Sequence, residues 1–279
     1  MKRYRHYDKD TAIILSCFGS VIEQDKYFEF QKYIQESFEN IPVFISFSSK
    51  MVIKKLAKEA KEYKNLPQVM ADVDMMGYKK YIVASINVFP TDEHEVLKRT
   101  VKGFREFSLA NIRYTNALLH KTKESSLFLK KLDETIRGGD EEMINLYIIH
   151  GVPVLDLAGL ESVRYCSDFL KVLNQNNLSC SLEGEYPFYA IKESIKKEIL
   201  KRLQKNQNIK INIVPFLLVS GNHYDNDMHE ILEEIKEYAP QAKIVDAIDG
   251  STKFNLLGLD EVREIFRANI EVELKKLGC

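Results

Sequence analysis

The chain has 279 residues, 45% of them hydrophobic and 29% charged, a composition typical of a globular protein with a buried core. Its formal net charge of −1 argues against general binding to nucleic acid or membrane surfaces. The four cysteines occur singly, which favours neither a zinc ribbon nor a disulfide framework. The first apolar run, residues 12–15, is too short for a signal-peptide core. We therefore expect a cytoplasmic protein.

Short apolar runs alternate with longer segments of helical periodicity along the whole chain. The predicted strands span residues 12–18, 42–47, 81–86, 112–118, 146–149, 178–182, 211–219 and 243–247. The predicted helices span residues 25–40, 49–63, 93–107, 160–174, 190–204, 227–238 and 260–277. Strands that alternate with helices indicate βαβ crossovers and parallel sheets covered on both faces. The predicted fold class is therefore α/β.

The second half of the chain repeats the pattern of the first. An apolar run leads to Gly19 in one half and to Gly151 in the other. We predict two similar lobes, each with a parallel four-stranded sheet, and a cleft between them. The N-terminal lobe would span residues 1–138 and the C-terminal lobe residues 139–279, with the last helix able to pack back on the first lobe. One continuous eight-stranded sheet is the alternative.

Polar side chains follow several predicted strands at their carboxyl ends, where open parallel sheets bind ligands. His150 follows the fifth strand, the segment 183–186 follows the sixth, and Gly221 and His223 follow the seventh. Imidazole and carboxylate together suit Co²⁺, Fe²⁺, Ni²⁺ or Zn²⁺, and imidazole also accepts protons near neutral pH. Either histidine taken alone is more often a hydrogen-bonded structural residue.

Other motifs carry less weight. Neither Gly19 nor Gly151 lies in a GxGxxG or GxxxxGK[ST] pattern, so nucleotide binding has little support. No GxSxG nucleophile elbow occurs. His94 and His229 lie at charged helix starts, and we expect both on solvated helix faces.

Several segments resemble the anaerobic sirohydrochlorin cobaltochelatases. The run Val214–His223, continuing to Asn226-Asp227-Met228, closely resembles the family signature Pro-Leu-Met-Leu-Val-Ala-Gly-Asp-His with its later Asn-Asp-Met. Residues 47–56 are similar to the family's Thr-Ser-Arg-Met-Ile-Ile segment, and residues 16–20 to its Ser-Phe-Gly-Thr-Ser opening. A weaker match covers residues 258–266, so the resemblance spans nearly the whole chain.

The resemblance implies a class II chelatase architecture, in which two flavodoxin-like or Rossmann-like lobes enclose a tetrapyrrole. It implies a metal chelatase, a lyase that inserts Co²⁺ into sirohydrochlorin in anaerobic cobalamin biosynthesis. The family's two functional histidines map onto His150 and His223, with catalytic and metal-binding roles. Its metal-binding glutamate precedes Tyr-Pro, but the segment here is one residue longer. The ligand is therefore Glu183 or Glu185, and we favour Glu183.

Further expectations follow from the same resemblance. The predicted substrate-binding residues are Ser20, Lys50, Glu185 and Gly221, with Lys50 standing where the family has arginine. The divalent metal is a substrate, with Fe²⁺ or Ni²⁺ as alternatives to Co²⁺, and no nucleotide is required. The tetrapyrrole is the expected partner, and a homo-oligomer is left open. The alternatives are a ferrochelatase acting on sirohydrochlorin or a porphyrin, a non-catalytic tetrapyrrole or metal carrier, and a sugar- or nucleotide-binding α/β protein.

Overall fold

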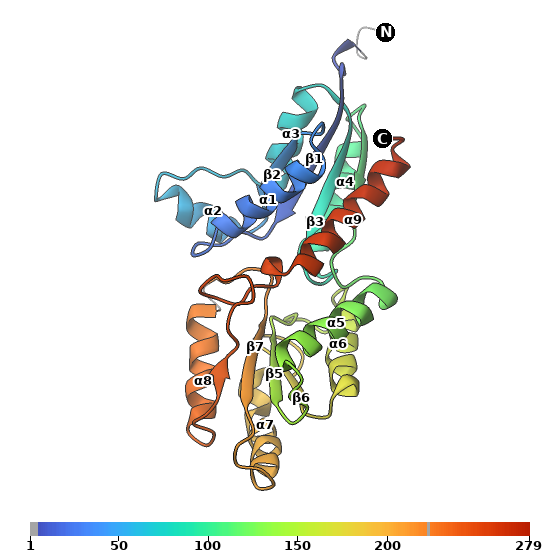
Figure 1. The fold of residues 1–279 in the computed structure, drawn as a ribbon. Coiled ribbons are helices and arrows are strands. Elements are labelled where there is room, and N and C mark those ends of the chain that lie inside the picture. The colour runs from blue at the N-terminus through green and yellow to red at the C-terminus, as the bar shows by residue number, and fades with distance from the viewer. Residues whose placement is uncertain (1–4, 222–223) are drawn as a thin grey trace. The chain divides into compact units, whose positions relative to one another are not determined.

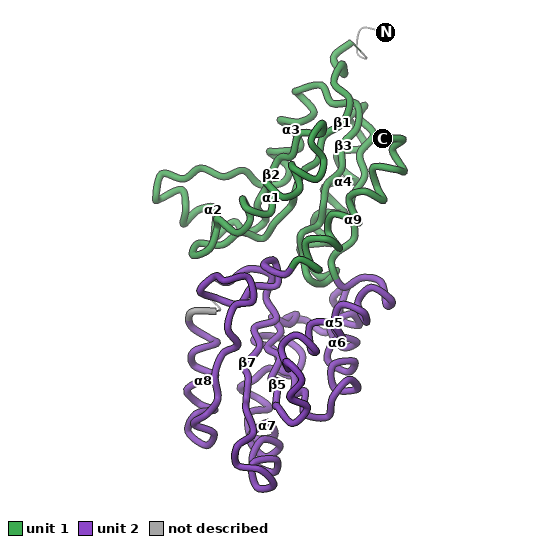
Figure 2. Tube along the Cα trace, viewed as in Figure 1, with its two compact units in different colours: residues 1–118, 260–279 green, residues 119–259 purple. Residues whose placement is uncertain are grey.

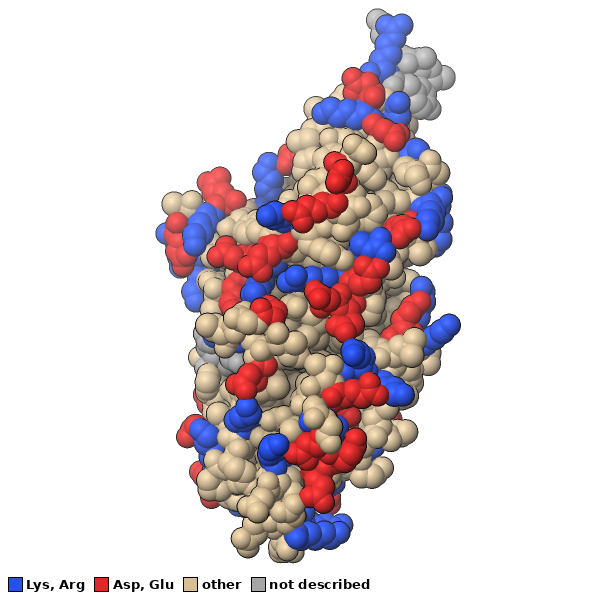
Figure 3. Space-filling view, viewed as in Figure 1, with Lys and Arg blue, Asp and Glu red and all other residues tan. Residues whose placement is uncertain are grey.

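The structure is a computed structural model that describes residues 5–221 and 224–279. The chain forms two compact units, residues 1–118 with 260–279 and residues 119–259 (Figure 2). In neither described part does a helix have the length and apolar character needed to cross a membrane. Acidic and basic side chains are interspersed over the face drawn in Figure 3.

Unit 1 is built on a parallel four-stranded sheet of order β2-β1-β3-β4 (Figure 1). Its elements are β1 (Lys9–Cys17), α1 (Asp25–Ser37), β2 (Val43–Phe47), α2 (Lys50–Ala57), α3 (Leu66–Met75), β3 (Tyr78–Ile86), α4 (Asp92–Arg105), β4 (Asn111–Tyr114) and α9 (Asp260–Lys276). Side chains alternate along β1, so Ile14 packs with Met70 of α3 and Val101 of α4 in a fully buried cluster. The other face is covered by α1 and α9, whose Phe30 and Phe266 rings lie 5.7 Å apart.

Unit 2 has the same topology, with sheet order β6-β5-β7-β8 and all strands parallel. Its elements are α5 (Thr122–Arg137), β5 (Ile144–Ile149), α6 (Leu160–Leu173), β6 (Asn177–Ser181), α7 (Phe188–Leu203), β7 (Ile211–Phe216), the π-helix η2 (Tyr224–Met228), α8 (His229–Lys236), β8 (Lys243–Ile244) and the 3₁₀ helix η3 (Leu256–Gly258). Helices α7 and α8 bury Ile199 and Ile235 against one face of the sheet. The predicted pair of four-stranded parallel sheets is thus confirmed, and the eight-stranded alternative is wrong.

The second unit begins earlier in the chain than the predicted C-terminal lobe, and the last helix packs on unit 1. The second unit begins at Leu119, whereas the predicted boundary at residue 138 lies after α5. Helix α5 belongs with unit 2 because Phe128 packs against Phe216 of β7, with ring centroids 6.5 Å apart, and Ser126 bonds Tyr165 of α6 at 2.6 Å. Helix α9 joins unit 1 through the Phe30–Phe266 contact. Two helices, α3 and α5, were not predicted.

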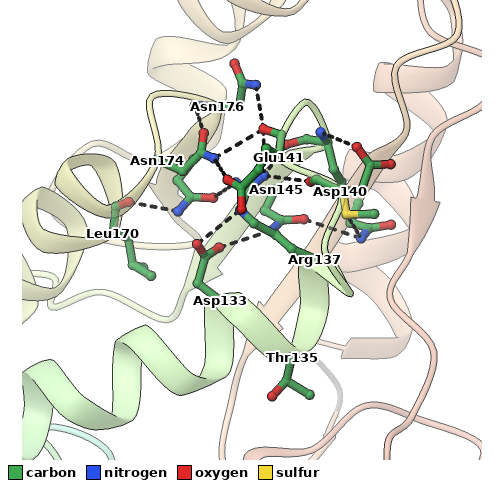
Figure 4. Close-up of polar contacts among 12 residues, drawn as sticks. Asp133, Thr135, Arg137, Asp140, Glu141, Asn145, Leu170, Asn174 and Asn176 are labelled. Atoms are coloured by element: carbon green, nitrogen blue, oxygen red, sulfur yellow. Dashed lines mark hydrogen bonds and ion pairs between the residues drawn. The ribbon is translucent and has the colours of Figure 1, made fainter.

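A buried polar network ties α5 to the amino ends of the unit 2 strands (Figure 4). The Asp133 carboxylate accepts hydrogen bonds from Arg137 Nε at 3.1 Å, Asn145 Nδ2 at 3.2 Å and the Tyr147 hydroxyl at 2.8 Å. Burial and the neighbouring Asp133 charge raise the pKa of Tyr147 well above its usual value, so the phenol stays a donor. Arg137 also donates to the Met143 carbonyl at 2.7 Å. Every charge in this network is paired, as burial requires.

Candidate metal centre

The carboxyl ends of β5 and β6 bring His150 and Glu183 together. The Leu182 N–H donates to the Ile149 carbonyl at 2.9 Å, and the Glu183 N–H donates to the His150 carbonyl at 3.0 Å. The half-buried His150 ring has Nδ1 3.2 Å from the Gly151 carbonyl oxygen. Because a carbonyl only accepts, Nδ1 is the donor in this contact, and in the neutral ring Nε2 then carries the lone pair. That tautomer is the one in which Nε2 can ligate a metal or take up a proton.

Two glycines allow the loops after β5 and β6 to interlock. Gly151 has φ +82° and Gly184 has φ +88°, both in the left-handed region. A β-carbon on Gly151 would lie 1.7 Å from the Glu183 carbonyl oxygen, and one on Gly184 would lie 1.8 Å from the Val152 carbonyl oxygen. The backbone of each loop therefore fills the space that a side chain on the other would need. This close approach fixes His150 and Glu183 relative to each other.

Gly151→Ala is expected to destabilise the protein by at least about 1–3 kcal/mol, the cost of a left-handed non-glycine residue alone. The clash with the Glu183 carbonyl also displaces the β6–α7 loop, so Co²⁺ affinity should fall together with stability. Denaturant unfolding and equilibrium dialysis with Co²⁺ measure the two effects. Gly138→Ala is the matched control, because Gly138 has φ +57° but no atom within 4 Å of an added β-carbon. Equal loss of Co²⁺ affinity in both variants would contradict the interlocking role of Gly151.

The structure separates the two candidate glutamates. Glu185 is half-buried, and its Oε2 accepts a hydrogen bond from the Val152 N–H at 3.1 Å. Its Oε1 is buried and has no hydrogen-bond partner among the described residues. Glu183, by contrast, is exposed at the sheet edge. A carboxylate that takes up a metal from solvent must be reachable, which favours Glu183, while Glu185 is bonded to the β5–α6 loop; the ligand stays a prediction.

The segment after β7 is anchored by the chain that precedes α9. The Leu217 and Leu218 carbonyls accept from Leu256 and Leu257 N–H groups, both at 3.0 Å, and the Ser220 N–H donates to Asn255 Oδ1. Gly221 is half-buried, and an added β-carbon there would meet no atom within 4 Å. The predicted ligand His223 lies outside the described residues. The segment 224–228 that follows is a π-helix, a form that is frequent at functional sites.

No group of three potential metal-ligating side chains occurs within residues 5–221 and 224–279. The predicted set combines two residues of that range, His150 and Glu183, with His223. Three of the cysteines, Cys17, Cys166 and Cys180, offer no substitute because they are buried, and the exposed Cys279 lies beside Thr11 of unit 1. Burial raises the pKa of all three thiols and keeps them protonated.

In unit 1, the predicted substrate residues Ser20 and Lys50 follow β1 and β2. The Ser20 hydroxyl oxygen accepts from the N–H groups of Ile22 at 3.1 Å and Glu23 at 3.0 Å. This buried side chain therefore shapes the turn before α1. Lys50 is exposed at the first position of α2, which Ser49 caps by accepting from the Val52 N–H at 3.3 Å. A substrate role for these two residues stays a prediction.

The hydrogen bonds at the two sheet edges are equivalent. The Ser48 N–H donates to Cys17 and the Ser49 N–H to Phe18, just as Leu182 and Glu183 donate to Ile149 and His150. Phe18 and Ser49 thus stand where unit 2 has its imidazole and carboxylate. Gly19, with φ +97°, corresponds to Gly151. The duplicated fold therefore places an imidazole and a carboxylate in unit 2 and an apolar ring and a hydroxyl at the equivalent positions in unit 1.

One histidine differs from its prediction. His94 was expected on a solvated face, but it is only 2% exposed and its Nδ1 lies 2.8 Å from the Ser85 hydroxyl. Its neighbours Glu93 and Glu95 are charged, yet the helix turns residue 94 toward the sheet. His229 is exposed as predicted. His94 is therefore a structural residue of unit 1.

Unit 1 and unit 2 share one parallel topology, and unit 2 carries an imidazole and a carboxylate at adjacent strand ends. This is the class II chelatase arrangement of a metal-inserting enzyme. The chain belongs to the cobalt chelatase (CbiK) family, whose model matches residues 11–272. It is accordingly a metal chelatase, with a divalent metal, foremost Co²⁺, and a tetrapyrrole as its substrates. No curated protein matches the chain in sequence.

Solved structures share this fold at low sequence identity. SirB from Bacillus subtilis with Fe³⁺ is 17% identical with a TM-score of 0.63, and 94% of each chain is covered. The sirohydrochlorin chelatase SirB from Bacillus subtilis subspecies spizizenii in complex with cobalt is 13% identical with a TM-score of 0.62, and 96% of each chain is covered. CbiX, described as the terminal enzyme for biosynthesis of siroheme in denitrifying bacteria, is 8% identical with a TM-score of 0.54, covering 94% of this chain and 98% of its own. These likenesses support the predicted architecture.

Proposed function

We propose that the protein inserts Co²⁺ into sirohydrochlorin, the step of anaerobic cobalamin biosynthesis to which its sequence motifs point. The observation that carries the proposal is the pairing of His150 and Glu183, whose backbones bond at 3.0 Å at the ends of adjacent strands. The likeness to SirB, which has been solved with cobalt, adds support. A cytoplasmic location belongs to the same proposal, because the cysteines are free thiols and such thiols are typical of a reducing compartment.

The chemistry requires two ring N–H protons to leave while the metal sheds water and enters the macrocycle. His150, Glu183 and His223 are proposed to hold Co²⁺ and to leave its other positions open to the ring nitrogens. As the ion passes to the ring, each imidazole is freed and can accept one of the two protons. Co²⁺ and the metal-free ring thus give the cobalt complex and two protons, with no change of oxidation state and no nucleotide.

The two glutamates are distinguished by isosteric amides. Glu183→Gln removes the exposed carboxylate, and we expect Co²⁺ affinity and kcat/KM for cobalt to fall by roughly 10–100-fold or more, as for a lost metal-site interaction. Glu185→Gln keeps an oxygen to accept from the Val152 N–H, so activity should stay within a few-fold of wild type. The assay follows the visible absorption of sirohydrochlorin on cobalt insertion. The opposite ranking of the two variants would assign the ligand to Glu185.

A metal-by-substrate screen separates the remaining alternatives. Turnover that is fastest with Co²⁺ and sirohydrochlorin supports the proposal, because ligand type alone does not select among these divalent ions. Faster turnover with Fe²⁺, or with a porphyrin, would instead define a ferrochelatase. Tight tetrapyrrole binding without turnover under any metal would define a carrier.

A further inference from the structure

Most of the buried side-chain polar atoms without hydrogen-bond partners in the described part of the chain belong to loops at the carboxyl ends of strands. Within the described residues there are four such side-chain atoms: Gln24 Nε2, Ser48 Oγ, Tyr81 Oη and Glu185 Oε1. Three of them lie in the loops that follow β1, β2 and β6, and Glu185 belongs to the candidate metal centre. Since nearly all buried polar groups in proteins are hydrogen-bonded, the two at the unit 1 edge need an explanation.

The Gln24 amide is held in one orientation. Gln24 is 8% exposed, and its Oε1 accepts a hydrogen bond from the Ser20 N–H at 2.7 Å. That bond assigns Oε1 as the acceptor and leaves the unpartnered Nε2 with its two N–H donors. Gln24 therefore presents donors, and no acceptor, at this edge of the sheet.

Ser48 presents a second donor beside the same loop. Its N–H donates to the Cys17 carbonyl at 2.8 Å, which places Ser48 at the end of β2 next to the end of β1. In the loop that also carries Gln24, Gly19 packs closely on β2 and α2: a β-carbon on Gly19 would lie 3.3 Å from Phe47 Cδ1 and 3.1 Å from Val52 Cγ1. The loop that carries Gln24 thus packs on Phe47, the residue before Ser48, and on Val52 of α2.

We propose that the Gln24 amide and the Ser48 hydroxyl form a carboxylate-binding subsite that holds one acidic side chain of the tetrapyrrole. The inference rests on the proposed function, since sirohydrochlorin carries eight carboxylates. Two unpartnered donors in the neighbouring loops after β1 and β2 call for an acceptor, and hydrogen bonds to a charged acceptor are about twice as strong as neutral ones. Lys50, exposed two residues beyond Ser48, adds positive charge to the same edge. Ser20 positions Gln24, because the Ser20 backbone N–H donates to Gln24 Oε1. The Ser20 hydroxyl oxygen accepts hydrogen bonds from two other backbone N–H groups.

Ser48→Ala is expected to keep or raise the stability of the free protein and to lower its affinity for the tetrapyrrole. Removing an unpartnered buried hydroxyl leaves the free protein as stable as wild type or more stable, because no internal hydrogen bond is lost. Affinity for metal-free sirohydrochlorin falls roughly tenfold to a hundredfold, the equivalent of one hydrogen bond to a charged group. Gln24→Glu keeps the acceptor for Ser20 but replaces the donors with a negative charge, so its affinity loss is larger.

Tyr81→Phe is the matched control. It also deletes an unpartnered buried hydroxyl, but that hydroxyl lies near Asp74, Tyr7 and Ser108, away from the carboxyl edge. Its stability should change in the same sense as that of Ser48→Ala, while sirohydrochlorin affinity stays at the wild-type value. Thermal unfolding followed by circular dichroism gives the stabilities, and absorbance titration with metal-free sirohydrochlorin gives the affinities.

The titration is repeated with uroporphyrin, an octacarboxylate porphyrin, as a probe that needs no turnover. Wild-type affinity of both Ser48→Ala and Gln24→Glu for both probes would overturn the subsite, as would an equal loss in Tyr81→Phe. Cobalt insertion is assayed separately. If wild type fails to insert cobalt but the two variants still lose affinity for uroporphyrin, the subsite stands and the proposed function falls.

Discussion

His150→Ala is expected to lower the kcat of cobalt insertion by roughly 10²–10⁴-fold, the range for loss of a proton-transferring group. The variant loses the proposed metal ligand and proton acceptor, both assigned to Nε2 because Nδ1 lies 3.2 Å from the Gly151 carbonyl oxygen. Co²⁺ affinity should fall as well, whereas tetrapyrrole affinity should be retained. Stopped-flow absorbance measures turnover, and equilibrium dialysis measures Co²⁺ binding.

Two comparisons make the His150 result specific. His120→Ala removes an exposed imidazole from the loop before α5 and should retain wild-type turnover. The double variant His150→Ala/Glu183→Gln should be little slower than the worse single variant, because residues that act as one unit have non-additive effects. Wild-type turnover in folded His150→Ala would remove His150 from the mechanism.

Arg137→Met is expected to destabilise the protein by about 3–5 kcal/mol, the cost of removing one partner of a buried ion pair. The Arg137 and Asp133 side chains are only 3% and 7% exposed. The substitution leaves the Asp133 carboxylate buried with the donors Asn145 and Tyr147 but no counter-charge. Denaturant unfolding at pH 7 measures the change in free energy.

The same helix supplies the control for this prediction. Lys130 and Glu134 form an i,i+4 pair at 3.9 Å with side chains 61% and 59% exposed, so Lys130→Met should cost less than about 1 kcal/mol. The network lies at the amino ends of the strands and the candidate metal centre at the carboxyl ends. Arg137→Met should therefore keep near wild-type kcat at temperatures where it is folded. Equal stabilities of the two variants would show that the buried network contributes little.

The sequence predicts most of the strands because parallel strands buried on both faces are continuous apolar runs. It misses α3 because Pro67 interrupts the periodic pattern, although Asn65 and Gln68 form a capping box at its start. It misses α5 although Phe128, Leu132 and Ile136 follow helical spacing and Gly138 ends the helix in a left-handed conformation. In both cases the sequence carries a local signal at the end of the helix, the capping box before α3 and the glycine after α5.

By itself, the sequence determined the α/β alternation, the duplication and the positions of His150 and Glu183, because these depend on local periodicity and on where each strand ends. Only the tertiary structure decided which glutamate is reachable, through the bond from the Val152 N–H to Glu185. It also set the start of the second unit at Leu119 and turned His94 toward Ser85. Each of these outcomes depends on a contact between residues of different elements. The spacing of residues along the chain does not predict such contacts, because they form only when the sheets and helices pack together.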